Sequence, residues 1–236
     1  GIAILWQANR HAQSSADFEK NNMVLGRYFS PDIKNEIEET GLNFSEYIPK
    51  NLNVAVLFTD IVGFTKLSEK MEPNDVLELL SEYQTIMVEC IFEFNGTVDK
   101  FIGDAVMANF GTPKSYGNDA QNAFNCAKKM KSMLHEWNKN RNDNRQKVIE
   151  HRIGIHYGEC IVGNVGGEKR VEYTVLGDTV NVASRLCDLS KIFNNDLLIS
   201  KALYDQIEIV EEYEEFDSHP IKGRKEKIDL IRVFLD

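Results

Sequence analysis

Two aspartates in this sequence stand where a carboxylate could bind a metal ion. Asp60 follows an apolar run at residues 54–58, with one threonine between them, and lies shortly before a glycine, while Asp104 belongs to a Gly-Asp pair. Carboxylate oxygens at such positions suit hard divalent cations such as Mg²⁺. Each residue also has an ordinary interpretation, because Asp60 could cap the next helix and Asp104 could serve a turn. The metal hypothesis therefore depends on whether the fold brings the two residues together.

The pattern of apolar residues predicts an α+β fold with the order strand, helix, hairpin, helix, strand. Residues 54–58 are typical of a strand buried on both faces, and a helical pattern follows from Pro73 to Gly96. The remaining predicted elements are strands at 97–101 and 105–110, a helix at 119–138, a polar loop at 138–146, strands at 151–156, 160–165 and 172–176, and a helix at 180–189. This is the order of a ferredoxin-like βαββαβ core, here with additional strands. In such a core the first strand lies beside the strand that ends the hairpin, so Asp60 and Asp104 are predicted to meet.

A helical segment is predicted to precede the globular body. Residues 1–41 form this lead-in, with a helix start at Pro31, and residues 42–236 form the domain. The apolar opening at residues 1–6 is consistent with the tail of a membrane helix or with the start of a packed helix. We expect a cytoplasmic domain, with an upstream sensor or membrane domain outside this sequence.

Composition narrows the function classes. The 236 residues carry 37 acidic against 27 basic side chains, a formal charge of −10, which argues against nucleic-acid binding. Four cysteines without a C-x-x-C pair indicate buried thiols and no zinc knuckle or disulfide framework. An anionic substrate would have to be met locally by a metal or by a few placed cations.

Four motifs closely resemble the class III nucleotidyl cyclase catalytic domain, and the resemblance runs from about residue 50 to 235 in the family's order and spacing. They are residues 58–65 (FTDIVGFT), 100–104 (KFIGD), 152–156 (RIGIH) and 173–185 (YTVLGDTVNVASR). Residues 27–31 (RYFSP) also resemble the helical lead-in found upstream of such domains. The function implied is an adenylate cyclase that converts ATP to 3′,5′-cyclic AMP and pyrophosphate.

The resemblance implies a head-to-tail homodimer with two active sites, each shared between the protomers. Asp60 and Asp104 would hold two divalent ions, Mg²⁺ or Mn²⁺, with the carbonyl of Ile61 as a further ligand. Arg152 would contact the phosphates from the same protomer. From the other protomer, Lys100 and Thr174 would read the base, and Asn181 would orient the ribose. Arg185 would stabilise the transition state, and Lys222 would hold the terminal phosphates.

The two base-reading positions favour adenine. Lys100 can only donate a hydrogen bond, which suits N1 of adenine, and the hydroxyl of Thr174 can accept one from the 6-amino group. Family members that use GTP typically carry Glu and Cys at these positions. With threonine at residue 174, the chain resembles the Thr-type subclass of adenylate cyclases, which is often bicarbonate-responsive.

Other interpretations remain open. The chain could be a catalytically silent regulatory half of a heterodimer, although such halves usually lose the metal carboxylates or the Asn/Arg pair, or it could be a guanylate cyclase. Arg185 could also pair with Asp188 on the helix surface. A diguanylate cyclase would require a Gly-Gly-Asp/Glu-Glu-Phe hairpin, which residues 102–105 (IGDA) do not provide.

Overall fold

The computed structural model describes residues 30–40, 49–144, 146–167, 170–220 and 227–235. Residues 1–29 of the predicted helical lead-in, and Lys222, lie outside this part of the chain. The elements in chain order are α2 (Pro31–Thr40), β1 (Lys50–Ile61), α3 (Phe64–Ser68), α4 (Pro73–Glu93), β2 (Thr97–Ile102), β3 (Ala105–Phe110), α5 (Asp119–Asp143), β4 (His151–Gly167), β5 (Arg170–Leu176), α6 (Asp178–Leu189), η3 (Ser190–Phe193), β6 (Leu197–Ser200), α7 (Lys201–Tyr204), β7 (Tyr213–His219) and β8 (Ile228–Val233).

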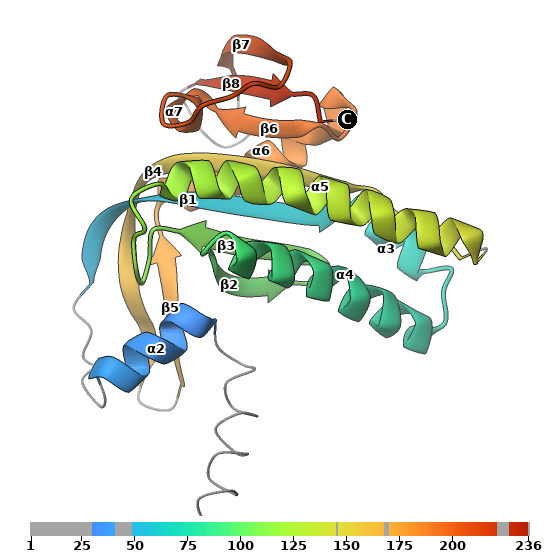
Figure 1. The fold of residues 1–236 in the computed structure, drawn as a ribbon, viewed down its shortest axis with the longest axis horizontal. Helices are drawn as coiled ribbons and strands as arrows, with labels where there is room; N and C mark the ends of the chain where they lie inside the picture. The colour runs from blue at the N-terminus through green and yellow to red at the C-terminus, as the bar shows by residue number, and fades with distance from the viewer. Residues whose placement is uncertain (1–29, 41–48, 145, 168–169, 221–226, 236) are drawn as a thin grey trace, which may run out of the picture.

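The ferredoxin-like prediction is confirmed. In the described residues the sheet has eight strands, in the order β2-β3-β1-β4-β6-β8-β7, with β5 paired to β4 outside this path (Figure 1). Strand β1 is antiparallel to both β3 and β4, so the first strand does lie beside the strand that ends the hairpin. The additional strands β6, β8 and β7 extend the core beyond β4.

The alternation of side chains along β1 divides the interior into two layers. Ala55 and Leu57 pack with buried residues of α4 and α5, while Val56 and Phe58 pack with residues of α6. Helices α4 and α5 therefore cover one face of the sheet and α6 covers the other (Figure 1). Because both faces are covered, residues 54–58 of the central strand are all apolar and buried, and the half-buried Asp60 comes only near the end of the strand.

Strand β4 corrects one sequence prediction, because the strands expected at 151–156 and 160–165 are one continuous strand. Gly158, which lies in the predicted gap, stays paired with Val54 of β1. At Gly154 a Cβ atom would lie 2.1 Å from the backbone nitrogen of Cys187. The glycine therefore lets α6 approach the strand closely.

Helix α5 corrects another prediction, because it continues to Asp143 through the segment expected to be a loop. The polar side chains of this segment anchor the chain that follows the helix. Asn138 donates to the carbonyl of Ile149 at 2.7 Å, and Arg141 donates from Nε to the carbonyl of Lys147 at 2.8 Å. A polar composition that suggested a loop thus reflects hydrogen bonds made from a helix.

The lead-in helix α2 packs on the domain. Ile33 is buried in the cluster that contains Phe58, and Ser30 Oγ donates to the carbonyl of Val98 at 3.1 Å while accepting from its amide at 2.9 Å. All four cysteines are free thiols and buried, as predicted. Within the described residues, no helix combines the length and apolar character that a membrane crossing needs.

Candidate active site

Asp60 and Asp104 lie together at the ends of neighbouring strands. Asp60 is the penultimate residue of β1, and Asp104 occupies the bend between β2 and β3. Asp104 Oδ2 accepts a hydrogen bond from the amide of Ile61 at 3.0 Å, which ties the bend to the end of β1. The fold thus brings the two carboxylates to one edge of the sheet, where the sequence predicted them.

Arg152 forms a two-pronged ion pair with Asp60. The two residues are opposite each other in the β1–β4 register, and Arg152 donates from Nε to Oδ1 at 2.8 Å and from Nη2 to Oδ2 at 2.6 Å. Bidentate pairs of this kind fix geometry as well as charge. The helix-cap interpretation of Asp60 is wrong, because the residue before α3 is Gly63 and no side chain caps that helix.

The electrostatics of this edge favour an additional cation. Burial raises the pKa of the Asp60 carboxyl, Arg152 opposes that shift, and the negative charges of Asp104 and Asp188 add to it. The pKa therefore stays raised although an arginine is in direct contact. A further positive charge beside Asp60 would stabilise its ionised form.

The donor set fits divalent ions that are shared with a phosphorylated substrate. Among the described residues, no group of three or more His, Cys, Asp or Glu side chains could hold a metal by itself. Mg²⁺ is commonly bound by one or two carboxylates together with substrate phosphates and water, which is what Asp60 and Asp104 can offer. Arg152 Nη1 is buried and lacks a hydrogen-bond partner in the described chain, so the ion pair with Asp60 leaves one donor of the guanidinium unused.

The two predicted base-reading residues are also brought together, through a residue that the sequence did not single out. Thr174 Oγ1 donates to both oxygens of Asp99, at 2.8 and 2.9 Å. Lys100 Nζ lies 3.5 Å from Asp99 Oδ1 and 3.2 Å from Glu172 Oε2. Lys100 of β2 and Thr174 of β5 therefore share one acidic partner.

Asp99 was missed because adjacent residues of a regular strand point to opposite faces. The β2–β3 register shifts between Val98 and Lys100, so the strand has an irregularity at Asp99. Burial raises the pKa of the Asp99 carboxyl, against the opposing effects of the Thr174 hydrogen bond and the Lys100 charge. Burial also lowers the pKa of Lys100, but the hydrogen bond that Lys100 donates to Glu172 and the charge of Asp99 raise it overall. In the sequence, the only sign of this role is that the residue directly before Lys100 is acidic.

Asn181 and Arg185 lie one turn apart on α6, with Asn181 exposed and Arg185 half-buried. In the described part of the chain, neither side chain bonds to Asp60 or Asp104, and the alternative pair of Arg185 with Asp188 is not formed. The carboxylate pair and the Asn181/Arg185 pair are thus separate sets within one chain. The role predicted for Lys222 stays a prediction, since that residue lies outside the described residues.

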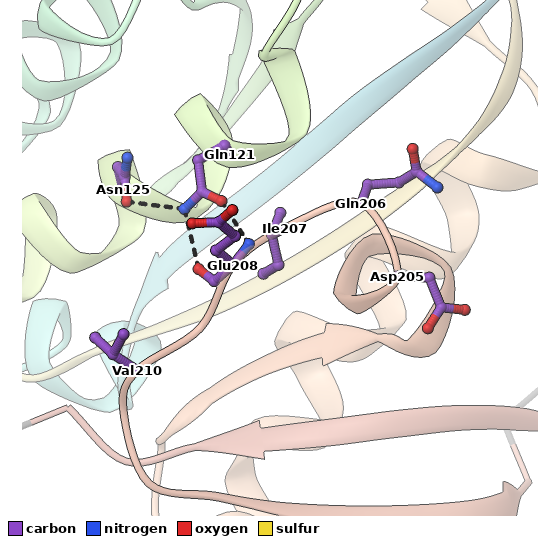
Figure 2. A pocket seen from close by; sticks show the side chains of 7 residues that line it. All are labelled: Gln121, Asn125, Asp205, Gln206, Ile207, Glu208 and Val210. Atoms are coloured by element: carbon purple, nitrogen blue, oxygen red, sulfur yellow. Dashed lines mark hydrogen bonds between the residues drawn. The ribbon is translucent and has the colours of Figure 1, made fainter.

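An open hollow of about 720 Å³ lies elsewhere, between α5 and the segment after α7 (Figure 2). In the wall of this hollow, hydrogen bonds join the side chain of Gln121 to the backbone of Glu208, and Gln121 also donates to Asn125. None of the predicted site residues lines it. The chemistry-bearing side chains and this hollow are therefore different places on the molecule.

Residues 46–232 match the family described as the adenylate and guanylate cyclase catalytic domain. Adenylate cyclase 1 of Rhizobium meliloti (strain 1021) is 31% identical over 217 residues, which are 84% of this chain and 33% of that protein. The structure of the adenylyl cyclase CyaB from P. aeruginosa is similar with a TM-score of 0.73 and 31% identity, over 80% of this chain and 96% of that chain. The guanylyl cyclase Cya2 is similar with a TM-score of 0.70 and 30% identity, over 78% and 93%. The chain spans about a third of the length of the curated relatives it matches.

Proposed function

Because the chain belongs to the family of adenylate and guanylate cyclase catalytic domains, we propose that it is an adenylate cyclase that converts ATP to 3′,5′-cyclic AMP and pyrophosphate. The observation that carries this proposal is the meeting of Asp60 and Asp104 at one edge, beside an arginine with a free donor. The same set argues against the catalytically silent alternative, because the carboxylates, Asn181 and Arg185 are all present in the chain.

The proposed reaction is an in-line displacement at the α-phosphorus. The ribose 3′-oxygen forms a new bond to phosphorus, the bond to the bridging oxygen of the β-phosphate breaks, pyrophosphate leaves, and the hydroxyl proton passes to solvent. Divalent ions held by Asp60, Asp104 and the Ile61 carbonyl would neutralise the phosphates and lower the pKa of the 3′-hydroxyl. Arg152 would contact the phosphates, while Asp60 holds its guanidinium in place.

We propose that the active form is a homodimer in which Asn181 orients the ribose, Arg185 stabilises the transition state and Lys222 holds the terminal phosphates of a site on the partner. Exposed apolar side chains occur on the β2–β3 hairpin and on strands β4 and β5, and their burial against a partner would favour association. They are Phe101, Ile102, Ile161, Val165, Val171 and Leu176, each 45–53% exposed.

The choice of ATP over GTP rests on Lys100 and Thr174. Similarity alone does not decide it, since the chain is about equally similar to an adenylyl and to a guanylyl cyclase structure. Lys100 can donate to N1 of adenine, which guanine replaces with a donor. We therefore assign the chain to the Thr-type adenylate cyclases.

The direct test is incubation of the protein with Mn²⁺ or Mg²⁺ and either ATP or GTP, with the product identified by mass. We expect cyclic AMP and pyrophosphate from ATP, and at least about tenfold less product from GTP. Cyclic GMP as the main product would favour the guanylate cyclase alternative. A folded, dimeric protein that forms neither product with either metal would favour the silent alternative.

Exchanging the base-reading residues should shift the preference from ATP toward GTP. Lys100→Glu with Thr174→Cys reverses the donor and acceptor presented to the base. Since Lys100 lies between the carboxylates of Asp99 and Glu172, the exchange would place three carboxylates together, and Glu172→Gln should be added to limit their repulsion. We expect the ratio of kcat/KM for ATP to that for GTP to fall at least about tenfold in the triple variant. A folded triple variant with an unchanged ratio would contradict the assignment.

A further inference from the structure

Asp99 is a fully enclosed carboxylate with an unusual set of partners. Its side chain is 0% exposed, although aspartates are almost never fully buried unless paired. It accepts from the Thr174 hydroxyl with both oxygens and from the amide of Val175 at 3.2 Å. Lys100, at 3.5 Å, is the positive charge beside it. Both residues that we propose to read the base are therefore in contact with Asp99.

The backbone holds Asp99 in this position. The irregularity in β2 between Val98 and Lys100 takes Asp99 out of the regular pairing with β3. Ser30 bonds to both the amide and the carbonyl of Val98, which fixes the chain immediately before Asp99. The carboxylate is thus directed to β5 by a local departure from strand geometry that two hydrogen bonds support.

The contact with Asp99 decides in which direction the Thr174 hydroxyl can bond. An ionised carboxylate can only accept, and a hydroxyl has a single hydrogen to donate. Once Thr174 gives that hydrogen to Asp99, its oxygen has only lone pairs left for a ligand. The 6-amino group of adenine can donate to this oxygen, whereas O6 of guanine would meet it lone pair to lone pair.

We propose that Asp99 is a positioning residue for nucleotide selection. It holds the Thr174 hydroxyl as a hydrogen-bond acceptor, and the site therefore selects adenine over guanine. This inference rests on the proposed adenylate cyclase function. Selectivity for adenine over guanine then depends on Asp99 as well as on Lys100 and Thr174. The carboxylate of Asp99 would act without touching the base.

The first test is the nearly isosteric variant Asp99→Asn. The Asn oxygen can still accept from the amide of Val175, while its amide group donates to Thr174 Oγ1 and leaves the hydroxyl hydrogen free to turn toward O6 of guanine. We expect the ratio of kcat/KM for ATP to that for GTP to fall about tenfold, mainly through a gain with GTP. In a Thr174→Ala background the same change should leave the ratio unaltered, because the two residues act as one unit.

The matched control is Glu172→Gln. Glu172 is the other carboxylate beside Lys100, yet no hydrogen bond joins its side chain to Thr174 among the described contacts. If loss of a negative charge near Lys100 were the cause, Glu172→Gln would change the ratio as much as Asp99→Asn does. That result, or an unchanged ratio in a folded and active Asp99→Asn enzyme, would overturn the proposal.

A measurement on the unaltered protein covers the case in which Asp99→Asn does not fold. Purine riboside triphosphate keeps the N1 acceptor but lacks the 6-amino group, so it would leave the Thr174 oxygen without its donor. We expect its kcat/KM to be about tenfold below that of ATP. Equal turnover of the two nucleotides would show that Thr174 is not an acceptor and would refute the role of Asp99. Failure to cyclise ATP at all would instead refute the proposed function.

Discussion

An Asp104→Asn variant is expected to remain folded and dimeric, yet to cyclise ATP at least about a hundredfold more slowly, a loss of about 2.7 kcal/mol of transition-state stabilisation. The asparagine oxygen can still accept the amide of Ile61, which Asp104 accepts at 3.0 Å, so the connection between the bend and β1 is retained. What the variant lacks is the negative charge that a divalent ion needs. Initial rates with saturating Mn²⁺ and Mg²⁺, beside the thermal unfolding midpoint, would measure both effects.

Asp60→Asn should lose activity to a similar extent but should also be less stable. Asp60 and Arg152 form a largely buried bidentate pair, and removing one charge leaves the arginine uncompensated. Asp188→Asn is the matched control, because Asp188 acts on the Asp60 carboxyl by its charge without being a predicted ligand. If Asp60→Asn or Asp104→Asn retained more than about a tenth of wild-type activity, about 1.4 kcal/mol of barrier, the metal role of that residue would be wrong.

The order of elements could be predicted from the sequence because each one carries a local signal. The apolar run before Asp60, the helix that follows Pro73 and the bend at Asp104 are recognisable from neighbouring residues alone, and their order implies which strands are adjacent. That the two carboxylates lie near each other then follows from topology, without any distance information.

The features that the sequence did not predict depend on contacts between distant residues. Asp99 reaches the site because β2 is irregular at this residue. In a regular strand, its side chain would point to the opposite face from that of Lys100. The sequence predicted a break between residues 156 and 160, but Gly158 in that gap stays paired with Val54 of β1. The pairing of Arg152 with Asp60 requires the register of β1 with β4, which spacing along the chain does not specify.

A mixed dimer should recover activity that neither parent has. Asp104→Ala and Arg185→Ala chains are each expected to be nearly inactive, because every site in a homodimer of either variant lacks one component. In a mixed dimer one site receives both defects and the other receives none, provided that the two residues act from different protomers. With equal co-expression about half of the dimers are mixed, and each has one intact site of two, so activity should return to about a quarter of wild type.

The separation of the two sets within one chain is what makes this result expected. In the described residues Arg185 makes no bond to Asp60 or Asp104, whereas Arg152 contacts Asp60 directly. The control is co-expression of Asp104→Ala with Asp60→Ala, whose defects belong to the same set, so that every site of every dimer is damaged and no activity should return. Mixed dimers of Asp104→Ala and Arg185→Ala that form, as shown by two different affinity tags, and yet remain inactive would place both sets in one protomer. In that case the geometry of a shared site would be wrong, while the metal role of Asp104 would be judged by its own variant.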